Sequence, residues 1–315
     1  MRCVVPHNVR VPILTDPLAA AHDVATLRDA VVAWFEDAAR DLPWRRPDRT
    51  AWGVLVSEVM LQQTPVVRVE PVWRAWMLRW PTPADLAAAS TADVLRAWDR
   101  LGYPRRALRL QECARAVVAR HGGAVPDDED ALLALPGVGE YTAAAVRAFA
   151  FGRRSVVVDT NVRRVLARTL TGTALPEPSY TAAERALAQA VAPADDDASA
   201  RWAAASMELG ALVCTARAPR CASCPVRSSC AWRAAGHPPD ELAHRRRGQA
   251  WHGTDRQVRG RVMALLREAS DPVDRERLLL VTDDRAQADR CLAGLVEDGL
   301  VEPSETDPDL FALPA

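Results

Sequence analysis

Residues 135–143 read Leu-Pro-Gly-Val-Gly-Glu-Tyr-Thr-Ala, with Gly137 and Gly139 on either side of one apolar residue. The flanking sequence has apolar residues at helical spacing, so the stretch joins two predicted helices. Glycine permits a tight turn and leaves backbone N–H groups bare, where they can face an anion. The stretch therefore predicts a tight connection that can hold a phosphate, and a plain connection between helices is the alternative.

Helical periodicity extends outward from this turn over most of the chain, which predicts an all-α fold. Further helices are expected between residues 169 and 214. No stretch of 18 or more apolar residues occurs, so no membrane span is expected. The predicted helices cover 25–40, 51–63, 68–80, 91–102, 105–122, 130–152 and 161–169.

Composition shifts divide the 315 residues into four predicted parts. An N-terminal extension (1–23) precedes a helical core (24–234), a linker (235–254) without periodicity, and a C-terminal module (255–315). Three helices and a short hairpin make the module winged-helix-like. The module has 8 Arg and 14 Asp or Glu, a net charge of −6, whereas the rest carries +5. The basic part is thus the expected nucleic-acid binder. The acidic module is expected to pack on the core or to recruit a protein partner. The linker arginines 245–247 are expected to touch the DNA backbone.

Four cysteines lie within seventeen residues, at Cys214, Cys221, Cys224 and Cys230. Thiolates select soft metal centres. Structural zinc usually takes two tight ligand pairs, but only one tight pair occurs here, so the spacing favours a [4Fe–4S] cluster. Zinc, or reduced cysteines without metal, are the alternatives. An intact thiolate cluster needs a reducing compartment, which predicts a cytosolic protein.

All 40 basic residues are arginine, and the chain contains no lysine. Arginine stays protonated and cannot form an imine with a carbonyl carbon. Any mechanism that requires a lysine Schiff base is therefore excluded.

Two carboxylates stand out. Glu58 lies within AWGVLVSEVML, a predicted helix that is apolar nearly all round and therefore buried. Burial should raise the pKa of its carboxyl, as a general acid requires, unless Glu58 lies at an exposed helix edge. Asp159 precedes a predicted helix and could simply be its N-cap.

The glycine turn, the segment Val156-Val-Val-Asp159-Thr-Asn161-Val-Arg-Arg-Val165 and the cysteine segment resemble, in order and spacing, the helix–hairpin–helix DNA glycosylases related to endonuclease III. The resemblance covers residues 24–234. Leu42-Pro-Trp44-Arg45 and Ser57-Glu58-Val-Met-Leu-Gln62-Gln63-Thr64 are similar to the signature of the adenine glycosylase (MutY) branch. Tyr141 stands where the endonuclease III branch carries a catalytic lysine. The resemblance implies a six-helix barrel with an iron–sulfur cluster domain.

The resemblance also implies a chemistry, the hydrolysis of the N-glycosidic bond of an adenine flipped out of duplex DNA. Glu58 would protonate the base, Asp159 would stabilise positive charge on the sugar, and Tyr141 and Asn161 would support both. A core position for Trp44, and solvated positions for Arg45 and Gln63, are the alternatives. The expected substrate and DNA contacts are Trp44, Arg45, Gln62, Gln63, Thr64, Tyr103, Gly137 and Gly139.

The expected partner is double-stranded DNA with adenine opposite 8-oxoguanine or guanine, bound by a monomeric, monofunctional enzyme. Residues 255–315 are too short and too helical for the nudix-like domain that many adenine glycosylases carry. Two other interpretations stay open: an endonuclease III-like glycosylase for oxidised pyrimidines, and a non-catalytic iron–sulfur DNA-binding regulator. The missing lysine and the presence of Glu58 disfavour the former, and the two carboxylates disfavour the latter.

Overall fold

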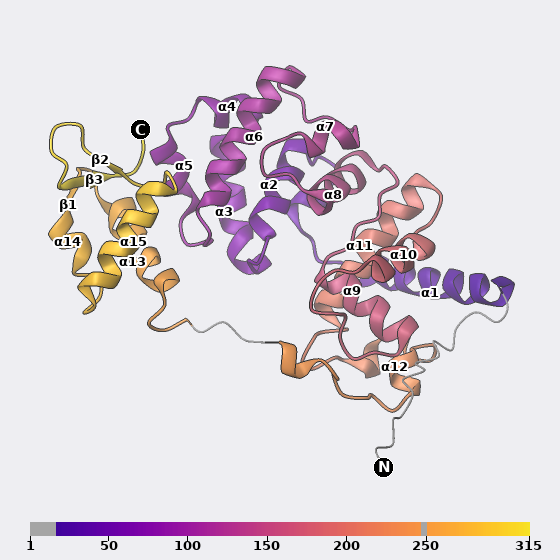
Figure 1. The fold of residues 1–315 in the computed structure, drawn as a ribbon. Helices are drawn as coiled ribbons and strands as arrows, with labels where there is room; N and C mark the ends of the chain where they lie inside the picture. Colours follow the sequence, from indigo (N-terminus) through magenta and orange to yellow (C-terminus); the bar gives the residue numbers. More distant parts are fainter. Residues whose placement is uncertain (1–16, 247–250) are drawn as a thin grey trace, which may run out of the picture. The chain divides into compact units, whose positions relative to one another are not determined.

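The structure is a computed structural model that describes residues 17–246 and 251–315. It is almost wholly helical, which confirms the predicted fold class (Figure 1). Residues 17–40 and 152–246 form a first compact unit, and residues 41–151 and 251–315 form a second. This grouping divides the predicted core of 24–234 between the two units, and the domain boundaries taken from the sequence stay a prediction.

The second unit begins with a bundle of short helices whose centre is α2, in which every residue from Trp52 to Met60 is buried. Thr50 caps this helix by accepting the N–H of Gly53 at 3.0 Å. Tryptophans pack edge to face around it, as in the pair Trp76 and Trp98 with ring centroids 5.6 Å apart. The elements are η1 (Pro43–Arg45), α2 (Ala51–Leu61), α3 (Val66–Arg79), α4 (Pro83–Ala88), α5 (Thr91–Trp98), α6 (Arg105–His121), α7 (Glu129–Leu133) and α8 (Glu140–Phe151).

The predicted glycine turn connects α7 to α8. Gly137 has a φ of 76°, in the left-handed region that favours glycine. A Cβ at Gly137 would lie 3.0 Å from the Cβ of Arg109 on α6, whereas a Cβ at Gly139 would meet nothing within 4 Å. Conformation and close packing together require glycine at position 137.

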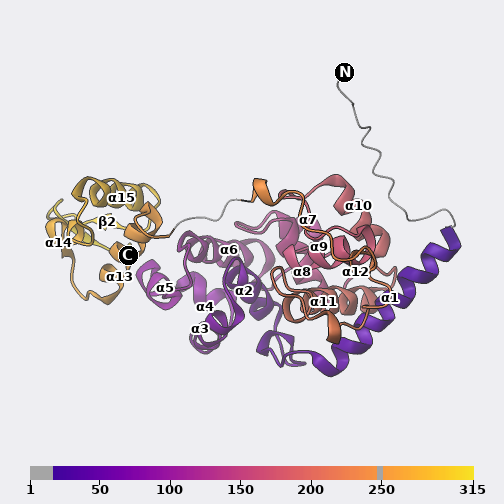
Figure 2. The same cartoon turned by 90° about the horizontal axis from the view of Figure 1, so that it is seen from below.

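In the first unit, α1 (Pro17–Ala38) runs along α11 (Asp196–Leu212), as Figure 2 also shows. Helix α1 begins inside the stretch assigned to an N-terminal extension, and residues 1–16 lie outside the described part of the chain. The buried Glu208 of α11 accepts two hydrogen bonds of 2.7 Å from the guanidinium of Arg40. The other elements are α9 (Thr160–Leu166), the π-helical turn η2 (Ala167–Thr171), α10 (Ala182–Val191), η3 (Cys221–Ser223), α12 (Ala231–Ala234) and η4 (Ala243–Arg245).

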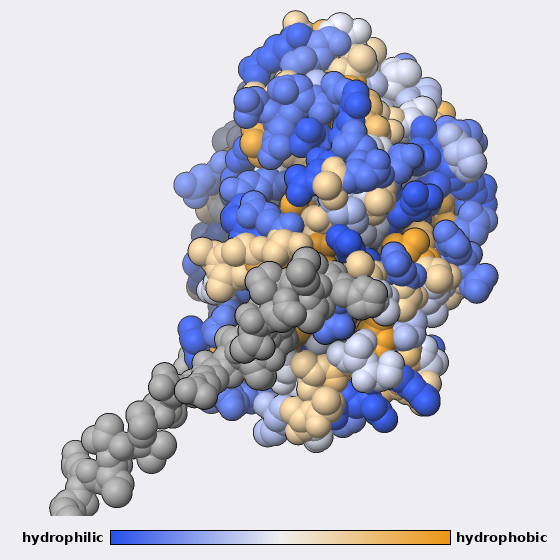
Figure 3. All heavy atoms as spheres, turned by 90° about the vertical axis from the view of Figure 1, so that its right-hand side faces the viewer, coloured by the Kyte–Doolittle hydropathy of each residue, from blue (hydrophilic) through white to orange (hydrophobic). Residues whose placement is uncertain are grey.

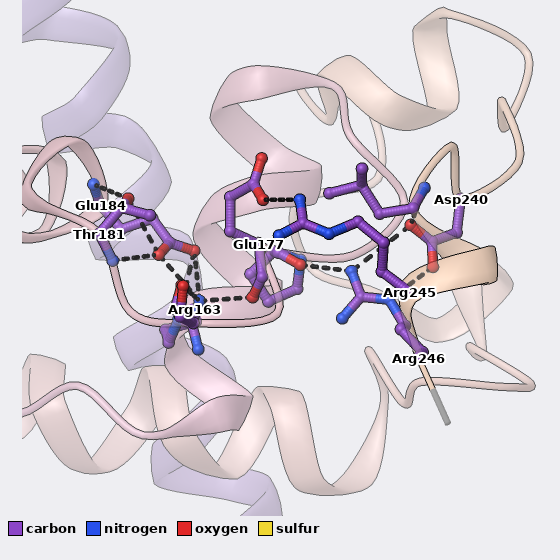
Figure 4. A network of polar contacts seen from close by, with 10 residues as sticks. Arg163, Glu177, Thr181, Glu184, Asp240, Arg245 and Arg246 are labelled. Carbon is purple, nitrogen blue, oxygen red and sulfur yellow. Dashed lines mark hydrogen bonds and ion pairs between the residues drawn. The ribbon is translucent and has the colours of Figure 1, made fainter. Parts of the chain in front are cut away.

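The predicted linker is anchored over residues 235–246, the first of its two described segments. Arg246 pairs with Asp240 at 2.6 Å and donates to the carbonyl of Pro176 at 2.5 Å, while Arg245 lies 3.6 Å from Glu177 (Figure 4). These contacts engage two of the three linker arginines expected to touch DNA. The third, Arg247, lies outside the described residues.

The C-terminal module has the expected winged-helix-like organisation. Its three helices surround a small antiparallel sheet of strand order β1-β3-β2, in which Val273 is registered with Phe311 and Glu302 with Ala312. The hairpin was expected, whereas β1 was not, because a two-residue strand leaves no periodicity. The elements are α13 (Asp255–Glu268), β1 (Val273–Asp274), α14 (Arg275–Leu279), α15 (Arg285–Glu297), β2 (Glu302–Pro303) and β3 (Leu310–Ala312).

None of the helices in the described ranges is long and apolar enough to cross a membrane. The face drawn in Figure 3 is largely hydrophilic, with apolar residues scattered over it. Scattered apolar residues are usual on protein surfaces and mark no interface by themselves.

Candidate functional site

The carboxyl of Glu58 is buried inside the second unit, as the apolar sequence of α2 predicts. Only 5 % of the residue is exposed. The hydroxyl of Tyr141, at the start of α8, donates to its Oε2 at 2.9 Å. The burial expected from the sequence is therefore confirmed, and the alternative of an exposed helix edge is wrong. The hydrogen bond orients a buried carboxyl, as proton transfer to a bound group requires.

Asp159 lies in the first unit as the N-cap of α9, so the capping interpretation is correct. Its Oδ1 accepts the backbone N–H groups of Asn161 at 2.8 Å and Val162 at 2.7 Å. Its Oδ2 accepts the side-chain amide of Asn161 at 2.7 Å. Burial raises the pKa of Asp159, and the three donated hydrogen bonds oppose that rise. The cap thus holds a buried carboxylate in one orientation, which leaves an electrostatic role open to it.

Arg164 connects this carboxylate to the cysteine segment. Its Nη2 donates to Oδ1 of Asn161 and to the carbonyl of Gly210, both at 2.7 Å, and its Nε donates to the carbonyl of Cys214 at 2.6 Å. A Cβ on Gly210 would lie 2.6 Å from the Cβ of Asn161, so glycine there allows α11 to approach α9. Sequence reasoning missed Arg164, because its only signal was a basic pair in the α9 motif.

Glu58 and Tyr141 belong to the second unit, and Asp159 and Asn161 belong to the first. The structure therefore brings together two pairs of the predicted catalytic residues, each within its own unit. Each pair joins a carboxyl to the side chain that orients it.

The four clustered cysteines line a single cavity of the first unit, together with Arg168 and Trp232. All four are free thiols, and burial raises the pKa of Cys224 to about 11. The guanidinium of Arg168 lies 4.5 Å from the ring of Trp232 and donates to Sγ of Cys214 at 3.4 Å. A cation beside the sulfurs suits a ligand set that is anionic when it binds metal.

The donor set of this cavity bears on the metals that the sequence left open. Across residues 17–246 and 251–315, no three potential ligands among His, Cys, Asp and Glu are grouped closely enough to hold one metal ion. A zinc ion needs all its sulfurs at about 2.3 Å. In a cluster, each thiolate binds a different iron, so the sulfurs stand further apart. Four thiols around one cavity supply one ligand for each iron, so the residues present fit such a cluster.

Four of the eight predicted DNA-contact residues lie in or beside two loops of the second unit: Gln62, Gln63, Thr64 and Tyr103. Gln63, between α2 and α3, is exposed with a φ of 55°, and Tyr103, before α6, is 43 % exposed with a φ of 49°. Left-handed backbone is costly for residues other than glycine, and it persists where surrounding structure imposes it, often at binding sites. Gln62 is the C-cap residue of α2, and Thr64 is buried.

Arg106, at the start of α6, donates hydrogen bonds to the backbone of both loops. Its guanidinium lies 5.5 Å from the ring of Tyr103, and burial lowers its pKa to about 10. No sequence signal distinguished it from neighbouring arginines. The groups to which it donates, in the two loops and the end of α2, are the carbonyls of Val59, Met60, Gln62, Leu101 and Gly102 and the hydroxyl of Thr64, at 2.5–3.3 Å.

Trp44 is buried in the hydrophobic core, with its ring centroid 5.5 Å from that of Trp73 in an edge-to-face pair. This geometry supports the core alternative for Trp44. Arg45 is partly buried in η1. Gly137 and Gly139 lie in the turn before α8, as predicted.

A larger cavity of about 580 Å³ lies in the C-terminal module, lined by residues of α14 and α15. Its charged residues pair with one another, as Arg275 does with Asp289 at 2.5 Å. Internal pairing of this kind gives the cavity no catalytic group.

Comparisons with known proteins agree on one family. Residues 56–193 match the HhH-GPD superfamily of base excision DNA repair proteins. The chain is 52 % identical to the adenine DNA glycosylase of Mycolicibacterium smegmatis over 90 % of its own length and 94 % of that protein. It is 50 % identical to that of Mycobacterium tuberculosis over 98 % of both chains. The human adenine DNA glycosylase is 45 % identical over 66 % of this chain and 39 % of the human protein.

Solved structures show the same fold. A thermostable thymine-DNA glycosylase superposes with a TM-score of 0.63 at 27 % identity, covering 69 % of this chain and 99 % of the other. An endonuclease III in a trapped covalent complex with DNA gives a TM-score of 0.60 at 24 % identity over 72 % of this chain and 100 % of that one, a likeness of fold alone.

Proposed function

Since the chain belongs to the adenine DNA glycosylase family, we propose that it removes adenine mispaired with 8-oxoguanine or guanine from double-stranded DNA by hydrolysing the N-glycosidic bond. The observation that carries this proposal is the buried Glu58, whose carboxyl is held by the hydroxyl of Tyr141. A carboxyl is a proton donor for a leaving base, whereas a lyase of the endonuclease III type would need a lysine at position 141.

Glu58 is the proposed general acid. Its proton passes to the adenine ring at N7, which makes the base a better leaving group as the bond to the sugar breaks. Proton transfer of this kind contributes roughly 10²–10⁴-fold to a rate. Tyr141 orients the carboxyl through its hydrogen bond.

Asp159 is the proposed stabiliser of positive charge on the sugar. The three hydrogen bonds that it accepts favour the ionised carboxylate that this role needs. Asn161 supplies two of them, and Arg164 in turn holds Asn161. The division of labour parallels the carboxylate pairs of glycoside hydrolases, and water completes the reaction at the sugar.

The enzyme is proposed to be monofunctional, because a chain without lysine forms no lysine imine with the sugar. This property separates it from an endonuclease III-like glycosylase for oxidised pyrimidines. The product is an intact strand with an abasic site, which breaks only in alkali or heat.

Cys214, Cys221, Cys224 and Cys230 are the proposed ligands of one [4Fe–4S] cluster, supported by the cavity that they share. The bound cluster would tie residues 214–230 to α9 and η2 and stabilise the fold. Iron analysis of anaerobically purified protein should give about four irons per chain. Stoichiometric zinc without iron would refute this assignment. The cluster also supports the proposal of a reducing, cytosolic location.

The proposed DNA contacts are Gln63, which fills the space left by the flipped adenine, and Tyr103 beside it, both exposed at the ends of loops that Arg106 holds. Gly137 and Gly139 would bind a backbone phosphate, which positions the duplex without reading its sequence. Gln62, Thr64, Trp44 and Arg45 support these loops and the adenine pocket. The enzyme is proposed to act as a monomer, and the acidic module to offer a surface for a protein partner.

The test is single-turnover release of adenine from a duplex with one adenine opposite 8-oxoguanine, followed by cleavage in alkali. Glu58→Gln should lower the rate at least roughly 10²-fold and leave duplex affinity within a few-fold, because the acid acts on the leaving group. The matched control is Glu112→Gln, on the exposed side of α6 in the same unit. Equal rates for the two variants would overturn the assignment of Glu58. Guanine, thymine and cytosine opposite adenine then define the mispair.

A further inference from the structure

The C-terminal module shares a hydrophobic core with the helices that carry the proposed DNA-contact loops. Helix α13 packs on α5, and Met263 and Leu266 of α13 belong to the same buried cluster as Leu95 and Trp98 of α5. The module therefore has a fixed position against the loop between α5 and α6, within the second unit.

Polar contacts bind the module to the Tyr103 loop itself. Nη1 of Arg256, in the first turn of α13, donates to the hydroxyl of Tyr103 at 3.0 Å. Asp298, at the end of α15, pairs with Arg105 at 3.1 Å. Arg106 thus holds the loop that carries Tyr103 through its hydrogen bond to Gly102, and the module holds it through the hydrogen bond from Arg256.

Arg256 also contacts Trp251. Its guanidinium carbon lies 4.9 Å from the centroid of the Trp251 ring, so the cation contacts the Trp251 ring as well as the hydroxyl of Tyr103. The Trp251 ring is 48 % exposed, and that of Tyr103 is 43 % exposed. The carbonyl of Trp251 accepts the hydroxyl of Thr254 at 2.8 Å, so the backbone at Trp251 is anchored to the start of α13.

Two acidic residues at this edge, Asp255 and Asp298, are paired with arginines of the module and of α6. Asp255 accepts from Arg290 at 2.9 Å, and Asp298 pairs with Arg259 as well as with Arg105. The overall acidity of the module is therefore neutralised locally at this edge. An exposed cation flanked by exposed aromatic rings is the chemistry that binds a phosphate backbone and stacks on bases.

We propose that Trp251, Arg256 and Tyr103 form one DNA-contact surface, to which the C-terminal module contributes Arg256 for a backbone phosphate and the end of the linker contributes Trp251 for a base or sugar face. The inference rests on the proposed function, because Tyr103 is its link to the damaged duplex. It extends the interface beyond the helix–hairpin–helix core to a module whose net charge predicts no DNA contact.

The experiment measures the affinity of the full-length protein for a fluorescein-labelled undamaged duplex, by anisotropy at several salt concentrations. Arg256→Ala should weaken binding roughly fivefold to tenfold and lower the salt slope by about one, the signature of one lost phosphate contact. Trp251→Ala should weaken binding roughly tenfold without changing the slope, because stacking releases no counterion.

Arg277→Ala is the matched control, since it removes one exposed arginine of the same module from α14. It should leave both affinity and slope unchanged. The alternative is that Arg256 acts only by positioning Tyr103. In that case Tyr103→Phe would weaken duplex binding as much as Arg256→Ala, and both variants would keep the wild-type salt slope. That result would refute the proposal. Wild-type affinity in both Arg256→Ala and Trp251→Ala, with unchanged thermal unfolding, would also overturn it.

The same variants are then assayed for adenine release. A wild-type protein that releases no adenine but binds duplex through Trp251 and Arg256 would refute the proposed function and leave this inference intact. A wild-type protein that releases adenine, together with wild-type affinity in both Arg256→Ala and Trp251→Ala, would support the proposed function and refute this inference.

Discussion

The Asp159 carboxyl caps α9 and, in the proposed mechanism, also faces the reacting sugar. A cap needs only an acceptor oxygen, which Asn supplies as well as Asp. Charge stabilisation needs the ionised carboxylate. The two roles can therefore be separated by a substitution that keeps the acceptor and removes the charge.

Asp159→Asn should lower adenine release by roughly 10²–10³-fold through loss of transition-state stabilisation. It keeps the acceptor of the two backbone N–H groups but loses the acceptor of the Asn161 side-chain amide, a cost that does not depend on pH. Burial raises the folded-state pKa of Asp159 above its unfolded value of about 3.9. The wild-type protein therefore loses stability as the pH rises from there through the folded pKa, a loss that the variant escapes.

Thermal unfolding of both proteins between about pH 4 and pH 8 checks the sign of this effect. The difference in melting temperature, Asp159→Asn minus wild type, should increase as the pH rises across that window. A melting temperature of Asp159→Asn that falls relative to the wild type as the pH rises, in a variant that is fully active, would contradict both roles given to Asp159.

Arg106 is the residue on which the two contact loops depend, through its hydrogen bonds to backbone carbonyls at the end of α2 and before α6. Arg106→Ala should lower the free energy of unfolding by about 3 kcal/mol, because several part-buried acceptors lose a charged donor. It should also weaken duplex binding. Arg115→Ala, an exposed arginine on the same helix, is the control for urea unfolding and anisotropy. Equal free energies of unfolding for Arg106→Ala and Arg115→Ala would show that the two loops do not depend on Arg106.

At the scale of elements, the turn between α7 and α8 distinguishes two glycines that look alike in sequence. Gly137 combines a left-handed φ with a close approach to Arg109, whereas Gly139 has neither constraint. Only the first is required by the fold. The second is free to serve a ligand.

Gly137→Ala should therefore lower the free energy of unfolding by about 1–3 kcal/mol, through backbone strain and a displaced Arg109 side chain. Gly139→Ala should leave stability unchanged within about 0.5 kcal/mol. Urea unfolding of the two variants measures the difference. A destabilised Gly139→Ala beside an unaffected Gly137→Ala would contradict the turn geometry.

At the scale of the whole molecule, the second unit is built from two separated pieces of chain that share one core. Removal of the C-terminal module would expose the side chains of α5 that are buried against α13. Deletion of residues 255–315 should therefore lower the melting temperature of the remaining protein, in addition to any effect on DNA binding. Calorimetry on the full-length and shortened chains checks this expectation. Unchanged melting would show that the module is an independent appendage.

The helices, the glycine turn, the cysteine segment and the exclusion of lysine chemistry could be predicted from the sequence. Local rules are sufficient for these features, because periodicity, turn chemistry and residue type are properties of neighbouring positions. The burial of Glu58 also followed from the apolar pattern around it, which the structure confirms. The two-residue strand β1 could not be found this way, because its pairing partner lies over thirty residues away at Phe311.

The sequence by itself determined which chemical groups the chain possesses and the family to which it belongs. Only the tertiary structure decided what its arginines do. Arg106, Arg164 and Arg256 look like dozens of other positions, yet one fixes two loops, one connects Asn161 to the cysteine segment, and one contacts Tyr103. A guanidinium has five donors on a long flexible chain. Its partners are therefore set by which distant segments pack beside it, and no local pattern records them.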